Sequence, residues 1–148
     1  MSCILASVDF SDSTPGVIDS AVRMAATFGL PLVICHVTEP IPQFVGGDAA
    51  FQTVQVPVPI DVEPQRARVA ELAEQTKARH EDTHGVMRMG PAVDEIIQTA
   101  REQGAEYIVM GSHGHGALYH LLVGSVVTGV LKHAGIPVVI TPPASGKR

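Results

Sequence analysis

The sequence has few aromatic residues: they make up 4% of its 148 residues, and tryptophan is absent. Aromatic side chains normally supply much of the buried surface of a domain. Valine, isoleucine, leucine, alanine and glycine must fill the core here instead. A core of small side chains suits helices that pack closely on a sheet.

Cysteine and long hydrophobic segments are also scarce. The two cysteines, Cys3 and Cys35, lie within apolar runs, which is typical of buried free thiols and a poor basis for a disulfide framework or a zinc site. The first residues carry no basic region followed by an apolar segment, and no run approaches the ~18 apolar residues of a membrane helix. We therefore expect a cytoplasmic protein without membrane insertion.

Basic residues are in the minority, with 10 lysines and arginines against 15 acidic residues and a formal net charge of -5. A general nucleic-acid binder needs a basic surface, so that function is not expected. A local phosphate site remains compatible with this charge, because helix N-terminal amides bind anions without a basic surface. The length predicts a single domain over residues 1–148 that is large enough to form its own core.

Short apolar runs alternate with helical patterns along the chain, which predicts an α/β fold with a parallel sheet. Helices are predicted where apolar residues recur at i, i+3, i+4 and i+7. A long helix is expected from Val62 to about Thr83, and a helix before the last strand carries Val127, Val130, Leu131 and Ala134. The expected strands are 4–8, 32–37, 84–89, 107–110 and 137–141.

A segment of about residues 40–61 interrupts this alternation and is rich in proline. Loops of this length in a small domain are usually functional or mobile. Three interpretations stay open at this point: a lid, a partner contact, or a variable insertion without a role. The tail, residues 142–148, is polar and is expected to be flexible.

The residues best suited to ligand chemistry follow the fourth expected strand. Glycines permit close approach of a backbone to a ligand, and the amides of a helix N-terminus point toward anions. The sequence therefore predicts a phosphate site built from backbone amides, hydroxyls and histidines. It is not a Walker A loop, since it contains no lysine, and its glycines do not follow G-x-G-x-x-G. The stretch comprises Gly111, Ser112, His113, Gly114, His115 and Gly116, followed by Gly124 and Ser125 at the start of the next helix.

The same stretch fits the pattern G-x2-G-x9-G-(S/T), with Gly111, Gly114, Gly124 and Ser125 at its fixed positions. With this motif, the acidic end of the first strand at Asp9 and the last helix and strand, the chain resembles the universal stress protein family, specifically its ATP-binding branch. The resemblance covers nearly the whole chain. It implies a three-layer, Rossmann-like sandwich, similar to adenine nucleotide alpha-hydrolases, with five parallel strands in the order 3-2-1-4-5. Strands one and four then meet at the switch point where such sheets bind ligands.

The resemblance implies a site for ATP or another adenine nucleotide, and Mg2+ is expected to assist. Asp9 would lie near the base and ribose, Val37 would meet adenine through its backbone, and Gly111 would face the ribose. Because aromatic residues are scarce, the base is expected to rest on strand-end backbone and aliphatic groups. From its place after a strand, Asp9 has an alternative role as a cap of the turn into the first helix.

The phosphates would be held by the last three motif residues. Members of this family often carry arginine in and just after the loop between the first two glycines, where this chain has His113 and His115. Histidine has an ordinary pKa near 6.5, so phosphate affinity is predicted to rise as the pH falls. The implied phosphate contacts are Gly114, Gly124 and Ser125, with Val126 continuing the turn and His113 in the loop.

The histidines invite a metal interpretation, which the sequence does not favour. His113 and His115 lie in a glycine loop that fixes no tetrahedral geometry, and no cysteine or acid is near in sequence. His36, on a buried strand, is expected to be a hydrogen-bonded core residue, and the pair His80 and His84 is expected to be solvated. No metal site is predicted.

Three functions stay open: an ATP-binding regulatory or stress-response module, an enzyme that hydrolyses ATP slowly in the same pocket, and a nucleotide-free interaction or chaperone-like protein. Hydrolysis needs charge neutralisation at the γ-phosphate, and the phosphate loop has no lysine or arginine. Binding is therefore favoured, and no catalytic residue is assigned. The intact glycines weigh against the third function.

The resemblance also implies a homodimer through the last strand, Pro137–Thr141, and an unidentified protein partner. The strand is apolar, and exposed apolar edges are normally covered or paired.

Overall fold

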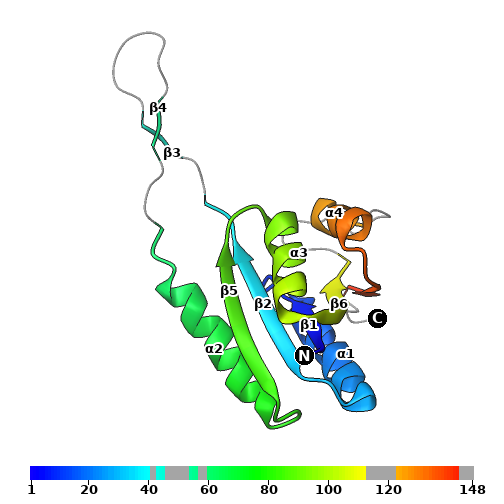
Figure 1. Cartoon of the computed structure of the whole chain (residues 1–148). Helices are drawn as coiled ribbons and strands as arrows, with labels where there is room; N and C mark the ends of the chain where they lie inside the picture. Colours follow the sequence, from blue (N-terminus) through cyan, green and yellow to red (C-terminus); the bar gives the residue numbers. More distant parts are fainter. Residues whose placement is uncertain (41–42, 46–53, 57–59, 113–122, 144–148) are drawn as a thin grey trace, which may run out of the picture.

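The structure, a computed structural model, describes residues 1–40, 43–45, 54–56, 60–112 and 123–143. Helices and strands alternate over most of this range, as Figure 1 shows. The elements are β1 (Cys3–Ser7), α1 (Thr14–Phe28), β2 (Leu32–Thr38), β3 (Gln43–Val45), β4 (Val54–Val56), α2 (Glu63–Lys77), β5 (Thr83–Met89), α3 (Ala92–Gln103), β6 (Ala105–Gly111), α4 (Ser125–His133) and β7 (Val138–Thr141).

One sheet of five parallel strands forms the centre of the domain, in the order β5-β2-β1-β6-β7. Counted along the chain, these strands have the order 3-2-1-4-5, so the expected Rossmann-like topology is confirmed. β1 lies in the middle, with Leu5 opposite Val33 of β2 and Ile108 of β6. The expected strand 84–89 is confirmed as the edge strand β5.

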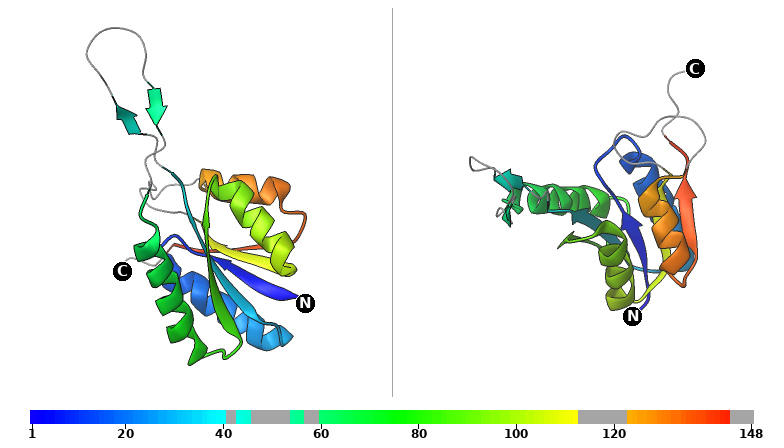
Figure 2. Two further views of the ribbon diagram at one scale, coloured as in Figure 1. Left: turned by 60° about the vertical axis from the view of Figure 1, so that its left-hand side comes forward. Right: turned by 90° about the horizontal axis from the view of Figure 1, so that it is seen from above.

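Helices cover both faces of the sheet and complete three layers (Figure 2). Successive residues of a strand point to opposite faces. In β1, Ile4 and Ala6 therefore join the core beneath α1 and α2, while Cys3 and Leu5 join the core beneath α3 and α4. All four of these side chains are buried.

Three expectations about individual elements need correction. The segment of about residues 40–61 includes an antiparallel pair, β3 and β4, with Gln43 opposite Val56. Its residues 41–42, 46–53 and 57–59 lie outside the described part. The long helix α2 ends at Lys77, not near Thr83, and in the turn that follows the amides of Arg79 and His80 both donate to the carbonyl of Thr76. Leu131 is 51% exposed, since Val127 and Val130 form the buried side of α4.

Residues 144–148 of the expected flexible tail lie outside the described part. Within the described residues, no helix combines the length and apolar character needed to cross a membrane.

Candidate functional site

The ends of β1 and β6 lie next to each other at the carboxyl edge of the sheet. Ser7 is opposite Met110 in the parallel register, so the chain leaves the sheet toward Asp9 on one strand and at Gly111 on its neighbour. Adjacent strands are about 4.8 Å apart. The structure thus brings two predicted site residues to neighbouring strand ends, at the switch point where α/β sheets bind ligands.

The carboxylate of Asp9 organises the turn into α1. Its Oδ1 accepts hydrogen bonds from the backbone N–H of Ser11 at 3.0 Å and from the Ser11 hydroxyl at 2.5 Å. The Ser11 hydroxyl also lies 2.8 Å from that of Ser13. The alternative role given to Asp9, a cap of this turn, is confirmed. It does not replace a ligand role, because a carboxylate accepts about four hydrogen bonds.

The N-terminus of α4 is fixed at the same edge by two backbone hydrogen bonds. Gly124 N–H donates to the Ser112 carbonyl at 3.0 Å, and Ser112 N–H donates to the Thr141 carbonyl at 3.0 Å. The helix therefore starts directly beside the end of β6. The first amides of a helix lack intrahelical partners and carry partial positive charge. This end of α4 is suited to an anion.

The two residues after Gly124 differ in their surroundings. Ser125, the first residue of α4, is exposed. Val126 is half-buried and packs against the core beneath α3 and α4. A ligand at this helix end would accordingly meet the Ser125 hydroxyl and the backbone, rather than the Val126 side chain.

Neither the backbone angles of Gly124 nor its described neighbours require a glycine at this position. Its φ of -59° suits any residue, and among the described residues an added Cβ would find only the Ser112 carbonyl oxygen within 4 Å, at an ordinary 3.6 Å. The contrast with Gly104 and Gly129 is clear: Gly104 has a φ of +66°, and a Cβ on Gly129 would lie 2.6 Å from Val93. Gly16, in the first turn of α1, resembles Gly124, with open space around it and no positive φ.

The predicted residue Val37 lies inside β2, which continues to Thr38, and its half-buried side chain packs against the α3 and α4 core. Its neighbour His36 is a hydrogen-bonded core residue, as expected: its Nδ1 lies 2.9 Å from the carbonyl oxygen of Val8.

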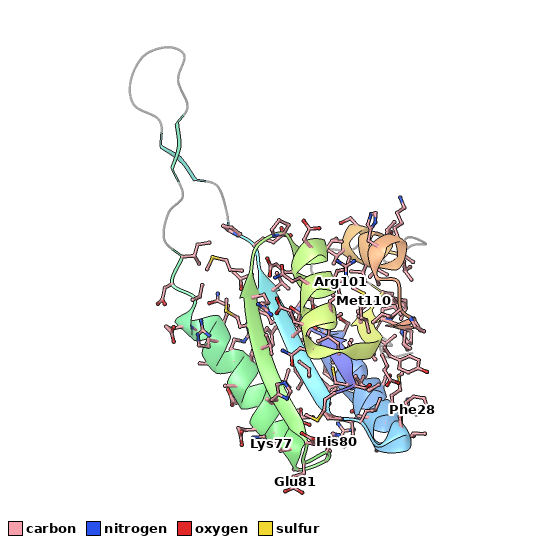
Figure 3. The ribbon with its side chains drawn as sticks, viewed as in Figure 1. Phe28, Lys77, His80, Glu81, Arg101 and Met110 are labelled. Atoms are coloured by element: carbon pink, nitrogen blue, oxygen red, sulfur yellow. The ribbon has the colours of Figure 1, made fainter. Side chains whose placement is uncertain are left out.

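Of the two histidines expected to be solvated, His84 is exposed, as expected, whereas His80 is half-buried. Its Nε2 lies 2.9 Å from the Leu30 carbonyl, and the Leu32 N–H donates to the Asp82 carbonyl at 2.8 Å. The α2–β5 turn, where Figure 3 labels His80, thus contacts the start of β2 at the amino end of the sheet.

The sequence did not predict a cluster of three side chains beside Asp9, formed by Phe10, His36 and Arg68. The ring of Phe10 lies 4.8 Å from the ring of His36, and the guanidinium carbon of Arg68 lies 4.2 Å from the centre of the Phe10 ring. Phe10 has a φ of +59°, unusual for an aromatic residue. Arg68 comes from α2, far along the chain, so no local spacing could have identified the cluster.

The two cysteines are buried free thiols. Burial raises the pKa of the Cys3 and Cys35 thiols to about 11 from 9.0, so both stay neutral in the core, in agreement with their prediction as free thiols. The described residues hold no cluster of three or more histidine, cysteine or acidic side chains suited to a metal ion. The predicted contacts His113 and Gly114 lie outside the described residues.

Comparisons with known proteins agree with this architecture. The model of the universal stress protein family matches residues 1–142. Universal stress protein A homolog 1 of Coxiella burnetii is 33% identical over 129 residues, which are 86% of this chain and 87% of that protein. A universal stress protein of Methanocaldococcus jannaschii is 30% identical over 139 residues, 93% of this chain and 79% of that protein.

Solved structures share the fold at lower identity. UspA from Lactobacillus plantarum has a TM-score of 0.71 at 18% identity, covering 95% of this chain and 97% of that one. A universal stress protein in complex with cAMP has a TM-score of 0.67 at 23% identity, covering 97% and 98%. The Archaeoglobus fulgidus protein in complex with dAMP has a TM-score of 0.64 at 21% identity, covering 95% and 98%. By the match of its sequence over nearly its full length, the chain belongs to the universal stress protein family.

Proposed function

We propose that this protein binds ATP or another adenine nucleotide at the carboxyl edge of its sheet and acts as a regulatory or stress-response module. The observation that carries the proposal is the start of α4. The first amides of this helix, which have no partners within the helix, lie beside the end of β6, and neither the backbone angles of Gly124 nor its described neighbours require a glycine there. A glycine of this kind permits close approach of a ligand to the backbone.

Two structures of the same fold support the choice of ligand. Their names describe complexes with cAMP and with dAMP. These two molecules share an adenine base, a sugar and a phosphate group. A site at the switch point of this sheet offers surroundings for each part: strand ends for the base and sugar, and a helix N-terminus for the phosphate.

In the proposed complex, the base and ribose lie toward β1 and β2. Asp9 accepts hydrogen bonds from ribose hydroxyls, Val37 contacts the base through its backbone, and Gly111 faces the ribose. The phosphates lie toward α4, where Gly114, Gly124, Ser125 and Val126 provide the contacts, with His113 nearby in sequence.

Mg2+ fits this complex as a companion of the phosphates. Its preferred ligands are carboxylate, phosphate and water oxygens in octahedral geometry. In this proposal the Asp9 carboxylate, which accepts two hydrogen bonds from Ser11 on Oδ1, serves the ribose hydroxyls and not the metal. When bound, the ion would neutralise phosphate charge, while the helix amides and the Ser125 hydroxyl orient the phosphates.

We favour binding over hydrolysis. Phosphoryl transfer depends on neutralising the charge of the γ-phosphate and on positioning a nucleophile. Residues 111–125 contain no lysine or arginine, and no catalytic residue is assigned. The proposed role is therefore that of a cytoplasmic nucleotide-responsive module that acts through a protein partner.

The proposal includes a homodimer formed through β7. Among the described residues, β7 pairs with β6 on one side only, and Val138, Val139 and Ile140 are half-buried. Apolar sheet edges are normally covered or paired. A second copy adding its own β7 would cover this edge.

Substitution of Ser125 tests the phosphate site separately from folding. An aspartate at the first position of α4 interacts favourably with the helix dipole, by about 0.3–1 kcal/mol, but repels a phosphate. Ser125→Asp should therefore bind ATP and AMP at least tenfold more weakly than wild type, bind adenosine equally well, and unfold at the same or a higher temperature. Ser125→Asn, of nearly the same size without charge, is the matched control.

Calorimetric titration with ATP, AMP, adenosine and GTP measures these affinities. Nucleotide released on denaturing the purified protein, identified by mass, reports what it carries from the cell. Failure of wild type to bind any adenine nucleotide, or equal loss of ATP and adenosine in Ser125→Asp, contradicts the proposal. Conversion of ATP to ADP on incubation would favour the hydrolytic function.

A further inference from the structure

Phe10 has a backbone conformation that needs an explanation. Its φ of +59° makes it the one non-glycine residue with positive φ in the described part of the chain. The left-handed region is disfavoured for residues with a Cβ, and bulky residues there are outliers. Such conformations persist where the surroundings hold them and are frequent at functional sites. Phe10 directly follows Asp9, the predicted base and ribose contact.

The left-handed conformation at Phe10 shapes the turn that orients Asp9. An Asp side chain that accepts a hydrogen bond from the amide two residues later forms a turn around the residue between them. Here Ser11 N–H donates to Asp9 Oδ1 at 3.0 Å, and Phe10 is the central residue. The backbone angle of Phe10 therefore determines whether Ser11 can reach the carboxylate.

The residue before Asp9 is fixed as well. Val8 N–H donates to the Cys35 carbonyl at 2.9 Å, and the Val8 carbonyl lies 2.9 Å from Nδ1 of His36. Both backbone polar groups of Val8 are thus tied to β2. With the residue before Asp9 fixed, the conformation of the next residue, Phe10, determines where the turn places Ser11 relative to the Asp9 carboxylate.

The Phe10 ring is held by groups from two other elements. The ring of His36, itself anchored by its bond to Val8, lies 4.8 Å away at an angle of 58°. Arg68 of α2 places its guanidinium carbon 4.2 Å from the ring centre, within cation–π range. The ring is also half-buried against the core beneath α1 and α2. Ring contacts can thus compensate for the unfavourable backbone angle.

We propose that Phe10 is a positioning residue: the contacts of its ring with His36 and Arg68 keep residue 10 left-handed, and this conformation aims the Asp9 carboxylate at the ribose of the bound nucleotide. The inference rests on the proposed function. A carboxylate held in this orientation would also determine specificity, because it distinguishes ligands that have ribose hydroxyls from ligands that lack them. A binding site that hydrogen-bonds a hydroxyl discriminates strongly against analogues that lack it.

Two substitutions separate this role from simple space filling. Phe10→Ala and Phe10→Gly both remove the ring, but glycine adopts the left-handed conformation without cost whereas alanine does not. If the ring only fills space, Phe10→Ala should disturb the Asp9 turn less than Phe10→Gly, because glycine adds flexibility. If the backbone angle matters, Phe10→Gly should disturb the turn less than Phe10→Ala. Arg68→Gln removes the cation above the ring, and Phe28→Ala removes an aromatic ring stacked on Tyr107 instead, as a control.

The first measurement needs no ligand: hydrogen exchange of the Ser11 amide, followed by NMR. We expect exchange in Phe10→Ala to be at least about fivefold faster than in Phe10→Gly, with Arg68→Gln between wild type and Phe10→Ala. Phe28→Ala should exchange at the wild-type rate. Equal rates in the alanine and glycine variants, or faster exchange in the glycine variant, would overturn the proposal.

The second measurement compares AMP with 2′,3′-dideoxy-AMP. The ratio of their affinities should be highest in wild type, fall several-fold in Asp9→Asn, fall nearly as far in Phe10→Ala, and stay higher in Phe10→Gly. An equal loss of affinity for both ligands in Phe10→Ala indicates a merely structural ring and overturns the inference. Absence of AMP binding by wild type would contradict the proposed function, while the exchange measurement still decides whether Phe10 orients Asp9.

Discussion

Replacing Gly124 by alanine should lower the affinity for ATP without changing the stability of the fold. The backbone at Gly124 has a φ of -59° and a ψ of 160°, which alanine adopts readily, and its Cβ would lie 3.6 Å from the Ser112 carbonyl oxygen. Alanine is a poorer residue than glycine before a helix, by about 0.5–1 kcal/mol. It also restricts the unfolded chain, which stabilises by about 0.4–1 kcal/mol. These effects offset, so the free energy of unfolding should change by less than about 0.5 kcal/mol.

The added methyl group should nevertheless obstruct the helix N-terminus. If a phosphate approaches the Gly124 backbone closely, we expect the affinity for ATP to fall at least tenfold, or about 1.4 kcal/mol. Gly129→Ala is the matched control in the same helix. Its Cβ would lie 2.6 Å from Cγ2 of Val93 on α3, and overpacking of this kind costs about 1–3 kcal/mol, partly offset by the higher helix propensity of alanine.

Urea unfolding and calorimetric titration of the two variants give the decisive comparison. Gly124→Ala should keep the wild-type midpoint and lose ATP affinity, whereas Gly129→Ala should unfold at lower urea concentration and keep its affinity within about twofold. Wild-type ATP binding by Gly124→Ala would refute the reasoning, because the glycine would then have no role in ligand approach. A large loss of stability in that variant would show a structural role that its surroundings do not indicate.

Three further predictions concern stability and assembly. Burial raises the pKa of Cys35 from 9.0 to about 11, so the thiol ionises at lower pH in the unfolded chain than in the folded protein. The free energy of unfolding should therefore fall between pH 9 and 11, by on the order of 2 kcal/mol. Urea unfolding of Cys35→Ala should show a smaller fall over the same pH range. Gly104→Ala should destabilise by about 3 kcal/mol in the same assay, because Gly104 has a φ of +66° and an added Cβ would overlap the Met1 carbonyl. Ile140→Asp should give a monomer in sedimentation experiments if β7 forms the dimer; a monomeric wild type would contradict that interface.

The fold was largely predictable because its signals are local. Runs such as Leu32–Thr38 are apolar without alternation, which is typical of strands covered on both faces. Gly29 and Gly104 both end helices in left-handed conformations, as expected for glycine at these positions. Strand order was implied by the family resemblance rather than by the residues, because pairing depends on contacts between distant segments.

The sequence predicted only those residues of the candidate site that lie near one another along the chain. Gly124 and Ser125 stand at fixed spacing after β6, and the structure ties Gly124 to the end of that strand. Arg68 was missed, because it reaches Phe10 from a helix whose periodicity identifies only its buried side. Leu131 was expected to belong to the buried side of its helix, but α4 buries only a narrower side that includes Val127 and Val130.

Hydrogen bonds fix the chain on both sides of the segment that contains β3 and β4. Before it, Gly90 N–H donates to the Thr38 carbonyl at 3.1 Å, and the Glu39 carboxylate accepts the Ala92 N–H at 2.8 Å. After it, the Asp61 carboxylate accepts the Glu63 N–H at 3.1 Å, where α2 begins. The entropy of closing a loop changes slowly with its length. The hydrogen bonds on either side do not depend on the residues in between, so we expect changes of length in this segment to leave the register of the parallel sheet unchanged.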